Sequence, residues 1–364
     1  MKTPADRLPL IDAMKGLACC LIVWHHLAFY GPMSEVARPL APWLMDSLAE
    51  YARMAVQLFL VIGGFLNARS LAPHGSARID APLARIGRRY LRLAMPYLVA
   101  LATGLVAAML ARRWLPGAAV VPAAPDESQL LAHGLFLQDL IGEEALSAGV
   151  WYVAIDFQLF ACTVLMFFAA QRWARRPATA TFWLVLGIVS VSLVVFNRLP
   201  ELDPTALYFF GAYGFGILAC WGAHSRRPGH WMAGIALLGG VALAVDFRAR
   251  IAVALAAALL LLWTHARHDR GRTPTAVLRY LGGVGRISYS VFLIHFPVLL
   301  CVGAAVHRLW PQGPEANALG MLAVFVLSLA AGLLLHRTVE SRAVGLGGFL
   351  LAMASILCLG LLLG

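Results

Sequence analysis

A succession of apolar runs, most of them long enough to cross a lipid bilayer, constrains this chain more than any other feature. A helical span needs roughly 20 mostly apolar residues to cross about 30 Å of hydrocarbon. Only 13% of the residues are charged and 61% are hydrophobic, too few polar groups to cover a water-facing surface. The predicted spans are residues 8–30, 51–68, 93–111, 150–170, 181–197, 206–221, 231–245, 251–265, 286–307, 316–336 and 344–363.

These runs predict an all-α fold, a polytopic transmembrane helical bundle of about 10–11 spans. The first run carries two histidines and is followed by no signal-peptidase pattern, so we expect a retained helix rather than a signal peptide. Residues 1–340 are expected to form one membrane domain of about ten helices. Residues 341–364 are expected to add a C-terminal transmembrane helix, for which no function follows from the sequence.

The positive charges predict the orientation of the bundle. With a cytoplasmic N-terminus, the inner segments hold 19 Lys/Arg and the outer segments 8, which matches the positive-inside rule. The longest outer loop, residues 112–149, contains five carboxylates. Because topology accounts for the net charge of +11, we expect a lipid bilayer and no nucleic acid as partner.

Ionisable side chains inside the spans are the first place to look for function, since each costs several kcal/mol there unless it is paired or solvated. The carboxylates well inside spans are Asp12 and Asp156, and the histidines are His25, His26 and His295. They do not form a set with recognisable zinc-ligand spacing, so no metal site is expected.

The first helix presents a polar stripe. Lys15 and His26 are eleven residues apart and about 20° out of phase, and Asp12 joins the same face. For Asp12 and Lys15 a functional role and a purely structural role are equally well supported, since the two side chains can form an ion pair with each other near the inner surface. His26 lies deeper without a partner one turn away, which favours function. His25 points about 100° away and is expected either to serve packing or to support the site from behind.

The stripe belongs to a wider pattern. Leu10-Ile11-Asp12-x-x-Lys15-Gly16 followed by His26 resembles the opening of the acyltransferase-3 family of bacterial integral-membrane O-acyltransferases. Four further segments match the family in order: residues 59–66, with Gly63 where a serine is usual; residues 88–97, rich in arginine; Trp151-Tyr152-x-x-x-Asp156-x-Gln158, with Asp in place of Glu; and residues 285–295, a Gly-x-Ile-Ser-Tyr…His element. Glu340 stands where the family often has Glu-x-Pro, but the proline is absent.

The resemblance implies transfer of an acyl group, commonly acetyl, from a cytoplasmic acyl-CoA to a hydroxyl of an envelope carbohydrate or glycolipid. The protein would then lie in the bacterial inner membrane, with acetyl-CoA or another acyl-CoA as donor substrate and no permanently bound cofactor. Arginines can hold the donor's phosphates through bidentate hydrogen bonds, although single juxtamembrane arginines often only enforce topology or bind lipid headgroups. The expected donor-binding residues are Lys15, Arg69, Arg85, Arg88, Arg89 and Arg92.

Acyl transfer to a hydroxyl needs a base, and neutral histidine suits that role near pH 7. The family match falls on His26, which either activates the acceptor or first takes the acyl group covalently. Asp156, expected near the outer end of the fourth span, would orient this imidazole or contact the sugar. Tyr152 is expected to anchor the interface, while sugar stacking by Trp151 stays open, and Gln158 is a supporting residue.

In the ninth span Ser288 and His295 are seven residues apart and share a face. We expect Ser288 and Tyr289 to be structural and His295 to be catalytic. Glu340 is expected to pair with Arg337 or Arg342 at the inner surface. The competing interpretation is a transporter of a small anion or glycan precursor that uses an Asp/Lys/His relay, but the two-fold internal repeat typical of transporters was not found.

Overall fold

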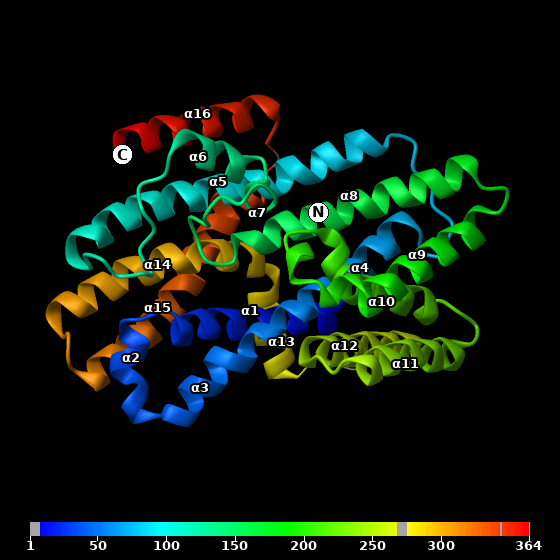
Figure 1. Cartoon of the computed structure of the whole chain (residues 1–364), viewed down its shortest axis with the longest axis horizontal. Helices are drawn as coiled ribbons and strands as arrows, with labels where there is room; N and C mark the ends of the chain where they lie inside the picture. Colours follow the sequence, from blue (N-terminus) through cyan, green and yellow to red (C-terminus); the bar gives the residue numbers. More distant parts are fainter. Residues whose placement is uncertain (1–7, 268–274, 343, 364) are drawn as a thin grey trace. The chain divides into compact units, whose positions relative to one another are not determined.

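The computed structural model describes residues 8–267, 275–342 and 344–363. The protein is 82% helical, and the described residues contain no strand. Ten helical segments within these ranges are long and apolar enough to cross a membrane, so the predicted class is confirmed. The helices (Figure 1) are α1 (Pro9–Phe29), α2 (Met33–Ala37), α3 (Pro42–Tyr51), α4 (Val56–Leu71), α5 (Pro82–Trp114), α6 (Glu127–Gly134), α7 (Gln138–Ile141), α8 (Val150–Trp173), α9 (Pro177–Val194), α10 (Ala206–Ala223), α11 (Pro228–Val245), α12 (Ala249–Ala266), α13 (Ala276–Arg286), α14 (Ser288–Leu309), α15 (Pro314–Leu335) and α16 (Leu346–Leu363).

The chain forms two compact units, each made of segments that are distant in sequence. Unit 1 comprises residues 1–15, 54–89 and 155–280, and unit 2 comprises residues 16–53, 90–154 and 281–364. Helices α1, α5, α8 and α13 each contribute residues to both units.

Unit 1 is built on the contact between α4 and α10. Gly64 of α4 lies against the backbone of Tyr213, and Gly216 of α10 lies against the backbone of Val61. A Cβ at either glycine would collide with a carbonyl group, so the glycines permit this close approach. Helices α9, α11 and α12 complete the unit around α10 (Figure 1).

Unit 2 is built on the antiparallel pair α14 and α15. Gly332 of α15 faces the backbone of Val291 in α14, again where a larger residue would collide. Helix α15 continues as one π-helical turn, His336–Glu340. Helix α16 packs on α6, where Met353 contacts Gly134.

The helix bounds differ from the predicted spans by more than five residues in two places. Helix α5 begins at Pro82, eleven residues before the predicted 93–111, so the arginine-rich stretch is the first part of the third spanning helix. Its 33 residues extend about 50 Å, more than the bilayer core requires. The second spanning segment likewise begins early, at Pro42, because α3, a 3-10 turn and α4 follow one another without a break.

Candidate active site

Two histidines from opposite ends of the chain meet in unit 2. His26 Nδ1 of α1 and His295 Nε2 of α14 lie 2.6 Å apart, and the two rings are stacked at 12° with centroids 4.8 Å apart. His295 is fully buried and His26 is 8% exposed. The two histidines singled out separately in the sequence therefore form one hydrogen-bonded pair.

The hydrogen-bond network assigns the tautomer of each ring. His295 Nδ1 lies 2.6 Å from the backbone carbonyl of Phe292, and because a carbonyl only accepts, this nitrogen carries the proton. In a neutral ring Nε2 of His295 is then the acceptor, so Nδ1 of His26 donates to it. This leaves a free lone pair on Nε2 of His26. Nε2 has no hydrogen-bond partner among the described residues. The arrangement provides one basic nitrogen whose ring is oriented by a second imidazole.

Gly149, just before α8, borders the pair. Its φ is +80°, in the left-handed region that favours glycine. A Cβ there would collide with the Phe292 ring and would lie 3.5 Å from Cε1 of His26. Tyr152 lies one turn further along α8 and packs edge-to-face on Phe292 at 5.7 Å. The glycine therefore lets the start of α8 pack closely against Phe292 beside the His26 ring.

Ser288 and Tyr289 form hydrogen bonds at the start of α14. The buried Ser288 hydroxyl donates to the Gly285 carbonyl at 3.0 Å, and the Tyr289 hydroxyl donates to the Leu93 carbonyl of α5 at 2.8 Å. The thiol of Cys19 donates to the Ser288 carbonyl at 3.6 Å, which ties α1 to the same point. These bonds set the position of the helix that carries His295.

Glu340 is not paired as predicted. Its Oε2 accepts from the buried Ser290 hydroxyl at 2.6 Å and lies 2.9 Å from Nδ1 of His336. The π turn explains the change, because it places the carboxylate against α14 rather than beside Arg337 or Arg342.

A second polar cluster lies in unit 1, around Asp156. Nη2 of Arg89 donates to Oδ2 of Asp156 at 2.5 Å, and the guanidinium lies 5.5 Å from the centre of the Phe160 ring. The sequence placed Arg89 at the inner surface and Asp156 near the outer end of its span, but the two side chains meet at one level.

Gly63 faces this ion pair. A Cβ at Gly63 would lie 3.6 Å from Oδ1 of Asp156 and 3.5 Å from the ring of Tyr213, which are ordinary contact distances. Two of the three departures from the family pattern noted in the sequence, at Gly63 and Asp156, are therefore neighbours in space.

The other predicted site residues are arranged as follows. Arg85 and Arg89 are half-buried on one face of α5, Arg88 is exposed, Arg92 further along the helix is exposed, and Arg69 is half-buried near the end of α4. Arg69, Arg85, Arg88 and Arg92 form no ion pair within the described part of the chain. Asp12 and Lys15 are both half-buried in α1.

Two supporting residues of α8 have clear contacts. Oε1 of Gln158 accepts from the backbone N–H of Ala206 at 2.9 Å, and its Nε2 donates to the Pro204 carbonyl at 3.2 Å. Gln158 thus caps the start of α10. Trp151 is half-buried and contacts Tyr152 edge-on at 6.1 Å. Across residues 8–267, 275–342 and 344–363, no group of three or more His, Cys, Asp or Glu side chains is placed to bind a metal ion.

Sequence reasoning missed Gly149 and Phe292, which border the histidine pair. The signal for Gly149 was a glycine directly before the Val-Trp-Tyr start of a predicted span. Phe292 lies inside the Gly-x-Ile-Ser-Tyr…His element, where an apolar residue in an apolar helix carries no signal of its own.

Comparison with known proteins places this geometry in context. A family model described as an acyltransferase domain, that of the acyltransferase-3 family, matches residues 8–337. No curated protein and no solved structure matches the chain. The match covers α1 to α15 and includes both histidines and the Arg89–Asp156 pair.

Proposed function

The chain belongs to the acyltransferase-3 family and is a membrane acyltransferase, and from this premise we propose that it carries an acyl group, most simply acetyl, from acyl-CoA to a carbohydrate hydroxyl. The acceptor would be an envelope carbohydrate or glycolipid. The protein would lie in the inner membrane with its N-terminus in the cytoplasm, as the positive-inside distribution favours.

The observation that carries the proposal is the oriented pair His26–His295. Acyl transfer needs a base that takes the hydroxyl proton while its oxygen attacks the thioester carbonyl. Nε2 of His26 has a free lone pair for this proton. As the tetrahedral intermediate collapses, the C–S bond breaks and the imidazolium returns the proton to the leaving thiolate, which completes the transfer.

His295 would act through His26. When His26 takes a proton, its Nδ1–H becomes part of a cation, and the hydrogen bond to Nε2 of His295 becomes charge-assisted and stronger. The carbonyl of Phe292 holds His295 in the tautomer that this bond needs. His295 is therefore proposed as the positioning residue and His26 as the catalytic base.

The arginines support an anionic donor. Arg85, Arg88 and Arg92 form no ion pair within the described residues, so their guanidinium groups are available to the phosphates of acyl-CoA. Arg89 is already engaged with Asp156, which makes the proposed role of Asp156 the positioning of Arg89 rather than of an imidazole.

The test is acyl transfer by the purified protein in nanodiscs, using radiolabelled acetyl-CoA and an envelope-glycan extract. The proposal expects label in the glycan fraction and release of free CoA in equal amounts. Intact-mass measurement after donor is added without acceptor separates the two chemical routes, since only a covalent route leaves an acyl adduct on the protein. Failure to bind or consume any acyl-CoA would overturn the proposal and bring the transporter interpretation forward.

A further inference from the structure

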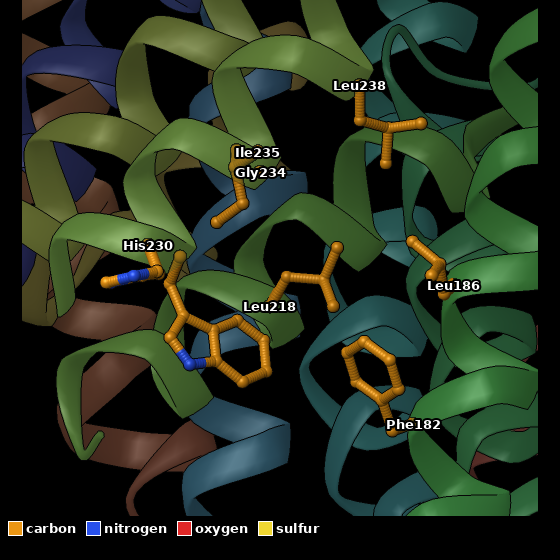
Figure 2. A pocket seen from close by; sticks show the side chains of 8 residues that line it. Phe182, Leu186, Leu218, His230, Gly234, Ile235 and Leu238 are labelled. Carbon is orange, nitrogen blue, oxygen red and sulfur yellow. The ribbon is translucent and has the colours of Figure 1, made fainter. Parts of the chain in front are cut away.

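A pocket of about 350 Å³ opens between α9, α10 and α11 of unit 1. Its walls are mostly apolar, formed by residues such as Phe182, Leu186, Leu218 and Ile235, and the polar side chain of His230 also lines it (Figure 2). Phe182 and Trp231 meet edge-to-face at 5.7 Å, so the starting turns of α9 and α11 lie at the same end of the pocket. This volume is in the range of pockets that hold small ligands.

The pocket lies on a surface that a membrane covers. Helices α9 and α11 have the least buried spanning windows of the ten, 28% and 17%. Trp183 and Leu237, each next to a pocket residue in sequence, are more than half exposed. Because these apolar helices span the membrane, their exposed surface contacts lipid chains, and the pocket is a recess that opens to those chains.

Exposed arginines precede two of the three helices that form the pocket, α9 and α11. Arg175 and Arg176 come directly before α9, and Arg226 and Arg227 come directly before α11. The segments 172–176 and 222–230 contain no carboxylate, and none of these four guanidinium groups forms an ion pair within the described residues. Trp231 is the fourth residue of α11, so Arg227 lies about 6 Å from it along the helix axis.

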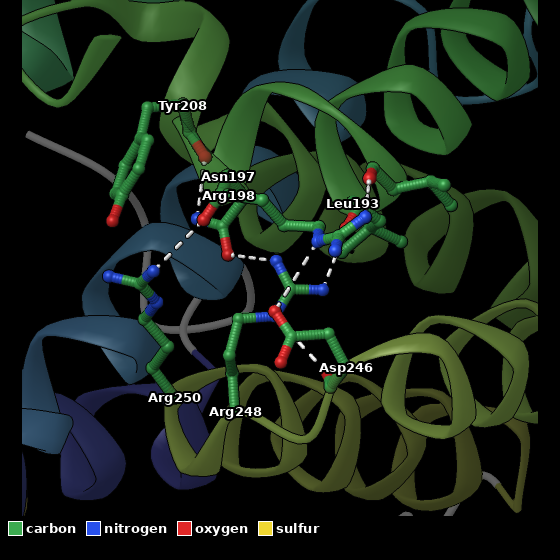
Figure 3. Close-up of polar contacts among 8 residues, drawn as sticks. Leu193, Asn197, Arg198, Tyr208, Asp246, Arg248 and Arg250 are labelled. Atoms are coloured by element: carbon green, nitrogen blue, oxygen red, sulfur yellow. Dashed lines mark hydrogen bonds and ion pairs between the residues drawn. The ribbon is translucent and has the colours of Figure 1, made fainter. Parts of the chain in front are cut away.

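The arginines at the other ends of the same helices behave differently (Figure 3). Arg248 donates to the Asn197 side chain at 2.7 Å and to the Leu193 carbonyl at 2.8 Å, and Arg198 and Arg248 both pair with Asp246. Arg198 and Arg248 thus have partners within the protein. The arginines next to the pocket have no such partners among the described residues, so they leave positive charge beside an apolar recess.

We propose that this pocket binds one anionic phospholipid, with an acyl chain against Phe182, Trp231 and Ile235 and the headgroup phosphate at Arg226 and Arg227. Apolar walls match the chain, and charge-assisted hydrogen bonds from arginine match the phosphate. The lipid is distinct from the proposed acyl donor and acceptor, and its binding does not depend on the histidine pair.

Two glycines of α11 provide a matched test. Gly234 lines the pocket and Gly240 does not, and at both a Cβ would meet no atom within 4 Å. Gly234→Phe is expected to fill the recess, and Gly240→Phe to leave it open. Native mass spectrometry of the detergent-purified protein, titrated with dioleoyl phosphatidylglycerol or dioleoyl phosphatidylcholine, measures how much of each lipid is retained.

Wild type is expected to retain one phosphatidylglycerol at least tenfold more tightly than phosphatidylcholine. Gly234→Phe should reduce that retention at least tenfold, and Gly240→Phe should not. Arg226→Gln with Arg227→Gln should lower phosphatidylglycerol to the level of phosphatidylcholine, whereas Arg308→Gln, at an exposed arginine in the last turn of α14, should not. Equal retention of the two lipids by wild type overturns the proposal, and so does equal retention by the two glycine variants. The arginine pair gives an independent reading if Gly234→Phe does not fold.

Discussion

Replacing His295 by leucine removes the acceptor for the Nδ1–H of His26 and leaves that N–H buried without a partner. An unpaired buried donor costs about 1–3 kcal/mol, and the cost is largest in the transition state, where His26 is cationic and the lost bond would be charge-assisted. A differential loss of about 2 kcal/mol lowers kcat by about 30-fold. The KM for acyl-CoA should stay within about twofold, because His295 is not expected to touch the donor.

His295→Gln provides the matched variant. A glutamine carbonyl at this position can accept from Nδ1 of His26 in place of the imidazole Nε2, so activity should recover to within about tenfold of wild type. His26→Ala should lose more than either, about 10²–10⁴-fold, since it removes the base itself. The assay is steady-state transfer from labelled acetyl-CoA in nanodiscs, after equal thermal melting of all variants is verified. Full activity of His295→Leu, or equal activity of His295→Leu and His295→Gln, would refute the positioning role.

Three further predictions concern other parts of the chain. Asp156→Ala should lower the melting temperature by an amount that corresponds to about 1–3 kcal/mol, because it leaves the partly buried Arg89 guanidinium without its carboxylate. A double variant that also replaces Arg89 by Met should recover part of this loss, and additive effects of the two substitutions would contradict the coupling. Gly149→Ala should lower both stability and transfer, whereas Gly142→Ala, with a similar φ of +78° but no neighbour within 4 Å, should lower stability alone by about 1 kcal/mol. Burial lowers the pKa of His133 in α6 from its usual value of 6.5. As the pH falls, the unfolded chain therefore takes up a proton at this histidine before the folded protein does, and thermal stability should decrease below about pH 6.5. Melting curves of His133→Gln should show a weaker dependence on pH.

The spans could be predicted because hydrophobic length is a local property of the sequence. The bounds failed where polar residues are helical, as in α5, which starts at Pro82 because its arginines lie on a helix that extends beyond the apolar core. The loop 112–149 also contains α6 and α7, two short helices that carry no spanning signal. Their stability comes from contacts such as those of α6 with α16, which a single segment does not reveal.

The candidate site could be predicted in part. His26 and His295 were identified separately, because histidines are costly inside spans, but their direct pairing joins residues 269 positions apart and depends on how α1 packs against α14. The depth of a site residue in the membrane was harder to predict than which residues belong to the site. Arg89 and Asp156 were placed on opposite sides of the membrane by counting along each span, and the long arginine side chain on an extended helix brings them together.

The most direct test of the account compares His26→Ala with His25→Ala in acyl transfer to the glycan extract. The two side chains are neighbours in α1 and are buried to a similar extent, but only His26 contacts His295, while Nδ1 of His25 lies 3.3 Å from the Leu48 carbonyl. His26→Ala is expected to lose at least about 10²-fold in rate, and His25→Ala is expected to stay within about tenfold of wild type. Equal losses in both variants, or undiminished transfer by His26→Ala, would contradict the assignment of His26 as the base.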